Sequence, residues 1–228
     1  MKSADTGPDT GPDTGPDDET GDETGDAAGA GPATRPGGRT ARVRAAVLLA
    51  AGDVLAERGF AHLDLADVAR RAEVGKTTVY RRWGTVTGLV ADLLLDMAQQ
   101  SVPRTETGTL LGDLTANARL VRRTLADPRQ GALFKAVIAA ATCDPQAAEA
   151  LHGFYAARVD AWAPCVRQAA ARGEVPAGTD PHEVIRAVSA PLYYRFLTTD
   201  LPLDEAAADR AAATAATAAR AGAYVRHD

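Results

Sequence analysis

The sequence has few of the residues that form catalytic or metal sites. Its four histidines, His62, His152, His182 and His227, are scattered and form no H-E-x-x-H motif and no Cys/His set at metal-ligand spacing. It also has no G-x-S-x-G, no P-loop and no G-x-G-x-x-G after a strand. We therefore expect a protein that is not an enzyme and that has neither a cofactor nor a metal ion.

Membrane and export signals are missing as well. No apolar run approaches the ~20 residues that cross a bilayer, and the acidic N-terminus is unlike a secretory signal. The two cysteines, Cys143 and Cys165, form no C-x-x-C pair. These features predict a cytoplasmic protein without a membrane partner, whose two thiols are free and buried.

Aromatic residues make up only 5% of the chain, whereas hydrophobic residues reach 46% and alanine dominates. Alanine-rich, glycine-poor stretches with a period of 3.6 residues favour closely packed helices over sheets. The length of 228 residues, less an unfolded arm, suffices for one large domain or two small ones. The predicted fold class is therefore all-α.

The N-terminal arm, residues 1–38, is acidic and rich in glycine and proline. Thr-Gly-Pro-Asp occurs three times over 6–17, and two Glu-Thr-Gly-Asp units follow over 19–26. Such a segment cannot bury a core and is predicted to be disordered. Two interpretations stay open: a neutral solubilising tail, or an arm that competes with DNA for a basic surface, so that deleting residues 1–34 would tighten DNA binding.

The net charge of −5 is divided unevenly along the chain. Residues 1–26 contain nine acidic residues and one basic residue, so the rest of the chain is positive. Residues 39–84 contain nine basic and five acidic residues. This positive segment is suited to contact with phosphates.

Residues 64–83 read as two short helices joined by a tight turn. Their order is Val-Ala-x-x-Ala-x-Val-x-x-x-Thr-Val-Tyr-x-x-Trp, and the second helix, over 76–82, opens with small polar and basic residues. We expect Val79 and Trp83 to point inward. A preceding helix over 40–58 is expected, with Thr40 as its N-cap, and the helix over 65–72 has Asp64 as N-cap and Asp67 in a capping-box position. A fourth helix begins near Thr87.

This order resembles the DNA-binding domain of the TetR (tetracycline-repressor) family from Thr40 to about Leu94. The resemblance implies that helix-turn-helix residues 39–86 bind DNA. At the start of the first helix, Thr40, Arg42 and Arg44 are expected to clamp the DNA backbone. Two alternatives stay open: Tyr80 as a partly buried anchor, and Arg82 as a solvated or ion-paired residue. The expected DNA contacts are Thr40, Arg44, Gly75, Lys76, Thr77, Thr78, Tyr80, Arg81 and Arg82.

The sequence departs from the family pattern at several positions. Glu73 stands where the turn usually has glycine, Gly75 where a capping serine is usual, and Val86 where a lysine commonly contacts phosphate. Ala66 has no side chain that reaches a base. These departures predict weaker or unusual operator binding.

Residues 87–228 are predicted to form a helical domain that binds a ligand and dimerises. Helices are expected near 109–126, 129–142, 145–172, 181–199 and 204–224, three of them starting at an Asp-Pro pair. Kinks are expected at Pro164 and Pro191. The resemblance implies that the last two helices pack against their symmetry mates. Large side chains among the alanines frame a cavity or simply fill the core; the candidates are Phe134, His152, Tyr155, Trp162 and Tyr193.

The predicted function is a ligand-responsive transcriptional regulator, a repressor that binds a palindromic operator as a homodimer. Its expected partners are double-stranded DNA, a second copy of the chain and a small-molecule effector. The alternative is a helical protein-interaction module whose DNA-binding head is weakened, which Glu73, Val86 and the acidic arm motivate.

Overall fold

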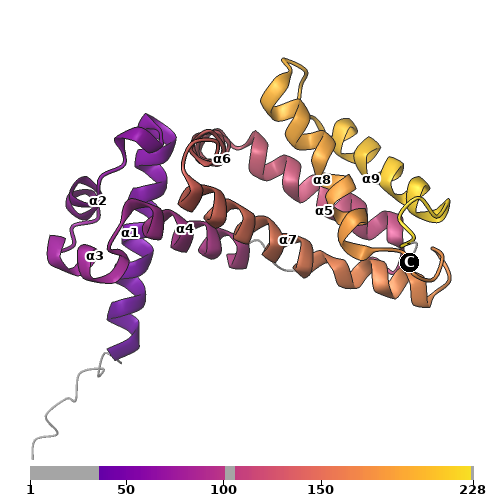
Figure 1. The fold of residues 1–228 in the computed structure, drawn as a ribbon, viewed down its shortest axis with the longest axis horizontal. Helices are drawn as coiled ribbons and strands as arrows, with labels where there is room; N and C mark the ends of the chain where they lie inside the picture. The colour runs from indigo at the N-terminus through magenta and orange to yellow at the C-terminus, as the bar shows by residue number, and fades with distance from the viewer. Residues whose placement is uncertain (1–35, 101–105, 227–228) are drawn as a thin grey trace, which may run out of the picture. The chain divides into compact units, whose positions relative to one another are not determined.

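The computed structural model describes residues 36–100 and 106–226, and this part of the chain contains helices and no strand (Figure 1). The all-α prediction is confirmed. The predicted acidic arm lies outside the described residues, except for its last three. The elements are α1 (Pro36–Arg58), the 3₁₀ turn η1 (Phe60–His62), α2 (Leu65–Arg71), α3 (Lys76–Trp83), α4 (Val86–Gln100), α5 (Leu110–Ala126), α6 (Pro128–Ala141), α7 (Pro145–Ala171), α8 (Pro181–Thr198) and α9 (Glu205–Arg220).

The first helix begins earlier than the sequence suggested. Helix α1 starts at Pro36, so Thr40 lies within the helix and is exposed. The prediction that Thr40 caps this helix is therefore wrong. Proline is favoured at a first helical position because its ring fixes φ near the helical value and its missing N–H would have no partner there. The helix therefore continues through two glycines that looked like part of the arm.

Aspartate caps begin most of the other helices, as predicted. Asp127, Asp144 and Asp180 each precede a proline at the first helical position, and each accepts a backbone N–H from the first turn. Asp64 likewise accepts the N–H groups of Ala66 and Asp67. The side chain of Asp67 instead pairs with Arg58 and Arg70, so the predicted capping box is only half formed.

The first hydrophobic core joins α1–α4 to α6 and α7. Its members are mostly branched or aromatic, and Val54, Val79 and Phe134 are fully buried in it. The indole of Trp83 is buried and donates from Nε1 to Asp92 at 2.9 Å. The inward direction of Val79 and Trp83 is confirmed, and this fixes α3 against the rest of the head, α1–α4.

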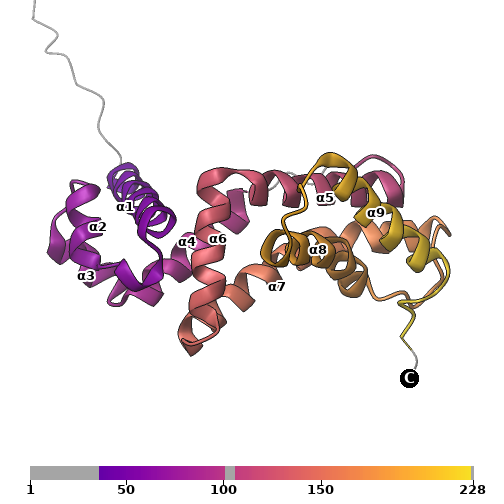
Figure 2. The same cartoon turned by 90° about the horizontal axis from the view of Figure 1, so that it is seen from above.

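The second core joins α5, the end of α7, α8 and α9. Trp162 and Cys165 lie in it, and the packed face of α9 is made of alanines. Figure 2 shows α9 beside α5 and α8. These alanines pack within the chain, chiefly on α5 and α8, so a partner chain would meet the other face of α9. They are Ala207, Ala208, Ala211, Ala212, Ala215, Ala216 and Ala219.

One of the two thiols differs from the prediction. Neither cysteine forms a disulfide, and Cys165 is buried, but Cys143 is exposed because it follows the end of α6 at the surface. Over the described ranges, no cluster of three His, Cys, Asp or Glu side chains is placed to hold a metal ion. None of the helices described combines the length and the apolar character of a membrane span.

Candidate nucleic-acid interface and effector cavity

Helix α3 presents one face to solvent. Because Val79 and Trp83 turn inward, Lys76, Thr77 and Arg81 are exposed on the outside, and Thr78 is half-buried. Gly75 precedes the helix and supplies no side-chain cap, so the first N–H groups of α3 remain available to a phosphate. The outer face therefore offers both charge and hydrogen-bond donors.

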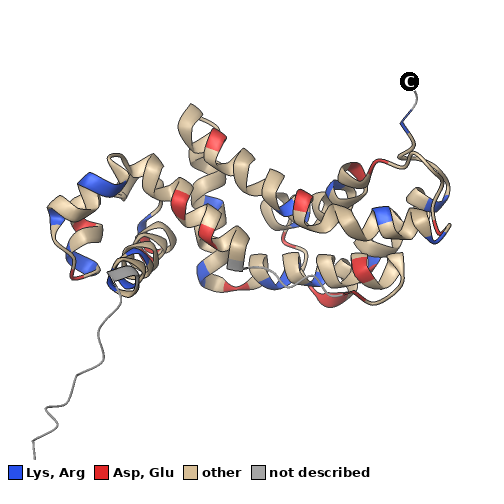
Figure 3. Cartoon of the chain, turned by 90° about the horizontal axis from the view of Figure 1, so that it is seen from below, with Lys and Arg blue, Asp and Glu red and all other residues tan. Residues whose placement is uncertain are grey.

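Aromatic side chains make cation–π contacts with two basic side chains of this helix. The Lys76 Nζ lies 5.6 Å from the ring centroid of Tyr80, and the Arg82 guanidinium lies 5.2 Å from that of Trp83. Tyr80 is 42% exposed, so its hydroxyl is open to a partner. Figure 3 shows basic positions along the α2–α3 part of the chain. The geometry suits a helix that contacts a polyanion.

Arg44 does not have the position predicted for a residue that clamps the DNA backbone. Its guanidinium is half-buried and binds Asp92 at 2.7 Å and Asp96 at 2.5 Å. The hydrogen bond to Asp92 is the largest cause of the raised pKa of Arg44. The predicted phosphate contact of Arg44 is therefore withdrawn, because the charge already joins α1 to α4. Thr40 remains exposed, but it lies inside α1.

The turn before α3 contains backbone strain. Glu73 has φ of +54°, and it is the non-glycine residue with positive φ in the described part of the chain. A residue with a Cβ in this conformation costs about 1–2 kcal/mol. The carboxylate of Glu73 is also exposed two residues before Gly75. Strain and negative charge both occur beside the candidate DNA-binding face.

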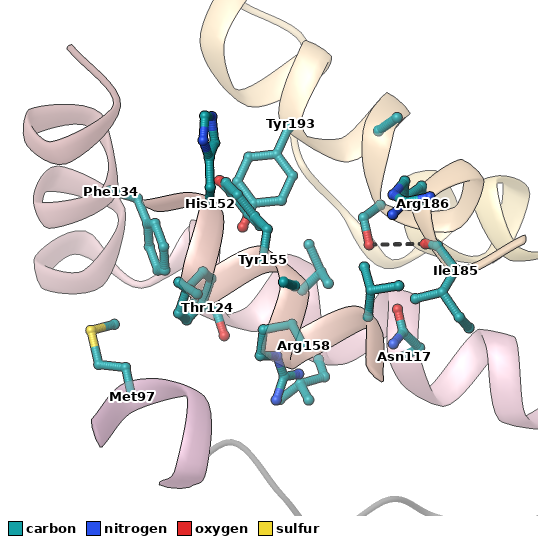
Figure 4. A pocket seen from close by; sticks show the side chains of 17 residues that line it. Met97, Asn117, Thr124, Phe134, His152, Tyr155, Arg158, Ile185, Arg186 and Tyr193 are labelled. Carbon is teal, nitrogen blue, oxygen red and sulfur yellow. Dashed lines mark hydrogen bonds between the residues drawn. The ribbon is translucent and has the colours of Figure 1, made fainter. Parts of the chain in front are cut away.

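A cavity of about 410 Å³ lies among α4, α5, α6, α7 and α8 (Figure 4). Four predicted residues line it: Phe134, His152, Tyr155 and Tyr193. Trp162 does not, because it is buried in the second core at 3% exposure, so its prediction as a lining residue is wrong. The volume is within the range of small-molecule sites.

Five polar residues that line the cavity were not predicted: Asn117, Thr124, Arg158, Arg186 and Ser189. Asn117 and Arg158 line it from α5 and α7. Asn117 is the sole asparagine of the sequence and falls on the apolar face of α5, between Leu114 and Val121. A polar residue at an apolar position is a signal that the sequence did contain. Arg158 carried no comparable signal, because arginine is common in this chain.

The polar groups of the cavity are strongly desolvated. Asn117 is only 2% exposed, and its Oδ1 accepts no hydrogen bond within the described structure. Burial lowers the pKa of Arg158 and raises the pKa of Tyr193 well above its ordinary value. Burial also raises the pKa of Tyr155, and the hydrogen bond from Tyr193 opposes this shift. Desolvation makes each of these groups a strong interaction site for a polar ligand.

Helix α4 connects the cavity to the head. Met97 lines the cavity, and Asp92 and Asp96 on the same helix bind Arg44 of α1. At its other end, Thr87 Oγ1 donates to Gln146 Oε1 of α7 at 2.7 Å. The same helix thus contacts the cavity, the ion pairs of α1 and the start of α7.

Two family models match the chain. Residues 47–93 match the model of bacterial regulatory proteins of the tetR family. Residues 104–215 match the model of the tetracyclin repressor-like C-terminal domain. The two matches correspond to the head and to the helices that enclose the cavity.

Two relatives and one solved structure support the same assignment. The HTH-type transcriptional regulator AqdR of Rhodococcus erythropolis is 32% identical over 72% of this chain and 80% of its own length. The uncharacterised HTH-type regulator YdeS of Bacillus subtilis is 30% identical over 68% of this chain and 78% of its own. The crystal structure of the TetR family regulator SCO0332 has a TM-score of 0.64 at 28% identity and covers 77% of this chain and 97% of that one.

Proposed function

This chain belongs to the TetR family of bacterial transcriptional regulators, and on that premise we propose that it is a cytoplasmic repressor controlled by a small molecule. It is a DNA-binding regulator with a ligand-binding C-terminal domain. In the proposed cycle, a homodimer occupies a palindromic operator and leaves it when an effector fills the cavity. The observation that carries the proposal is the cavity, because Met97 on its wall belongs to the helix that holds α1.

The proposed DNA contacts lie at the start of α3 and along its outer face. Thr77 and Thr78 are short donors for phosphates or base edges, and Lys76 adds charge and reach. We expect Tyr80 to bond a phosphate and Arg81 to bond a guanine edge through two hydrogen bonds. Thr40 remains in the set and Arg44 leaves it. The proposed set is Thr40, Gly75, Lys76, Thr77, Thr78, Tyr80, Arg81 and Arg82.

The proposed dimer uses the outer faces of α8 and α9. Tyr194, Leu197 and Leu201 expose 67%, 43% and 58% of their surface, which is unusual for large apolar side chains so close together. A groove of about 330 Å³ between α8 and α9 lies beside Tyr194 and Leu201. A two-fold interface here would cover both features. One reading head per chain then places half-sites about 34–36 Å apart.

The proposed coupling runs through α4. An effector that packs against Met97 displaces α4, and the ion pairs of Asp92 and Asp96 transmit the displacement to α1 through Arg44. Because Trp83 also donates to Asp92, α3 moves with α4. The separation of the two α3 helices in the dimer then no longer matches the operator.

Selection of bound sequences from a random DNA pool, followed by gel-shift titration, tests the proposal. Arg81→Ala should weaken binding by about 1–3 kcal/mol and relax specificity at one base position. Lys76→Ala should weaken binding to all DNA sequences equally and reduce the salt dependence of the affinity. The matched control is Arg123→Ala, which removes an exposed arginine of α5 far along the chain from the head.

Two results would contradict the proposal. Failure of any sequence to be enriched would favour the alternative, a helical interaction module with a weakened head. A monomer at micromolar concentration in sedimentation, with and without the selected DNA, would exclude the dimer. Tyr194→Glu is the interface variant, since it places a charge on the proposed dimer surface and should yield monomers that bind DNA poorly.

A further inference from the structure

The charge of the cavity has one sign. Its ionisable lining residues are Arg158, Arg186, His152, Tyr155 and Tyr193, and none of the described residues that line it is an aspartate or glutamate. Arg186 also pairs with Glu183, at 2.6 Å near the surface. Burial lowers the pKa of Arg158, the guanidinium on the α7 wall of the cavity. A ligand carboxylate would pair with this desolvated cation, whereas a ligand cation would be repelled.

One acceptor in the cavity lacks a donor. Asn117 is only 2% exposed, and its Oδ1 has no hydrogen-bond partner within the described structure. Its side chain extends from α5 toward the cavity (Figure 4). A buried polar atom without a partner is destabilising, and a ligand donor would satisfy it. The site is therefore suited to a ligand that carries a hydroxyl or an N–H group.

Aromatic rings form one side of the cavity. Phe134 and Phe154, Phe154 and Tyr155, and Tyr155 and Tyr193 lie with their ring centroids 5.3 Å apart in successive pairs. The Tyr155 and Tyr193 rings meet edge to face at 87°. Such a row offers ring faces and edges to a further flat ring. Leu120, Val121 and Ile185 add an aliphatic part to the wall.

We propose that the effector is a flat aromatic carboxylic acid that also bears a hydrogen-bond donor. Its ring packs along the row from Phe134 to Tyr193, its carboxylate pairs with Arg158, and its donor bonds Oδ1 of Asn117. This inference rests on the proposed function of the cavity as the effector site. The competing class is an aromatic or quaternary cation, which the tyrosine rings would suit but the guanidinium of Arg158 opposes.

Direct binding to the full-length protein without DNA tests the ligand class. The probes are naphthoate, a hydroxynaphthoate set with the hydroxyl beside the carboxylate or across the rings, and naphthylmethylamine as the cation of the same shape. Isothermal titration should rank the best hydroxynaphthoate about tenfold above naphthoate. The amine should bind more weakly than either. Absence of hydroxynaphthoate binding at about millimolar concentration, or stronger binding of the amine, would overturn the proposal.

Variants assign the two polar contacts. Asn117→Leu should abolish the preference for the hydroxyl while leaving naphthoate binding in place. Arg158→Met should weaken the binding of naphthoate and hydroxynaphthoate by about tenfold to a hundredfold. It should leave the affinity for the amine unchanged or increase it. Arg167→Met is the matched control, because it removes an exposed arginine from the same helix outside the cavity. If Arg158→Met does not fold, Arg158→Gln replaces it because it also removes the charge, and unchanged affinity for naphthamide, a neutral isostere of naphthoate, shows that charge is what was lost.

Different results would contradict the proposed function and the proposed ligand class. Release of operator DNA by the amine, with no effect of the acids, would retain the effector cavity and exclude the acidic ligand. Binding of the acids with no change in operator affinity would retain the ligand class and exclude the cavity as a regulatory site. Equal affinity of wild type and Arg158→Met for both acids would exclude the carboxylate contact.

Discussion

The two hydrophobic cores of this protein are built from different residues. The first core packs branched and aromatic side chains of the head against Leu133, Phe134, Leu151 and Phe154 of α6 and α7. The second core packs seven alanines of α9 against α5 and α8. Large side chains join segments distant in sequence across wide gaps, whereas alanines allow helix axes to approach closely.

This difference has a consequence for regulation. The first core crosses the predicted domain boundary at residue 86, so the head shares its interior with the helices that enclose the cavity. The second core lies beyond the cavity and holds α8 and α9, the helices proposed for the dimer. A ligand between the two cores, at Phe134 on one side and Ile185 on the other, contacts both.

Removing volume should damage the first core most. Leu94 of α4 is fully buried there. Leu94→Ala should reduce the free energy of unfolding by about 2–5 kcal/mol, because it removes apolar contacts and leaves a void. Urea unfolding followed by circular dichroism measures the loss. The exposed Leu95→Ala is the control, and an equal loss for both would show that burial at position 94 is unimportant.

Adding volume should damage the second core. Ala212 is fully buried on α9, whereas its neighbour Ala213 is exposed. Ala212→Leu should cost about 1–3 kcal/mol of unfolding free energy, because a larger side chain forces α9 away from α5. Ala213→Leu should stay near the stability of the wild type. Equal tolerance of both changes in thermal melts would mean that the alanine face is loosely packed.

Asp92 tests the polar junction of the first core. Burial raises its pKa, but the hydrogen bonds from Arg44 and Trp83 outweigh burial, so its pKa in the folded protein lies below the ordinary 3.8. The stabilisation is complete above that ordinary pKa and is lost as pH falls through the lowered one. Asp92→Asn should cost about 1–3 kcal/mol near neutral pH and reduce the loss of stability in acid.

Urea midpoints measured from neutral pH down to about pH 3 give both effects. The control is Asp209→Asn, which alters an exposed pair with Arg119 and should change the midpoint less. If the urea midpoints of wild type and Asp92→Asn fell in parallel with pH, the protonation of Asp92 would not be linked to folding.

The smallest expected effect is a gain at Glu73. Glu73→Gly should stabilise the head by about 0.5–1 kcal/mol, because glycine adopts the +54° φ without strain but loses more backbone entropy. It should also tighten operator binding at low salt by removing a carboxylate beside α3. Glu73→Gln separates the causes, since it removes the charge and keeps the strain. Stability that rises equally in both variants would exclude strain as the cause.

Most features of the head could be predicted from the sequence. The inward positions of Val79 and Trp83 and the Asp-Pro helix starts were predictable, because local periodicity and capping chemistry do not depend on distant contacts. The DNA contacts of the outer face of α3 stay predictions. Arg44 was misassigned because its partners Asp92 and Asp96 are about 50 positions away in the chain, at separations of 48 and 52.

By itself, the sequence determined the helical class and the helix-turn-helix order, since composition and spacing alone specify them. Only the tertiary structure decided which bulky residues surround a cavity and which fill a core. Phe134 and Tyr193 meet at the cavity, whereas Trp162 is buried in the second core. The physical reason is that a cavity depends on how separate helices pack against one another, and helical periodicity fixes only which face of each helix is buried.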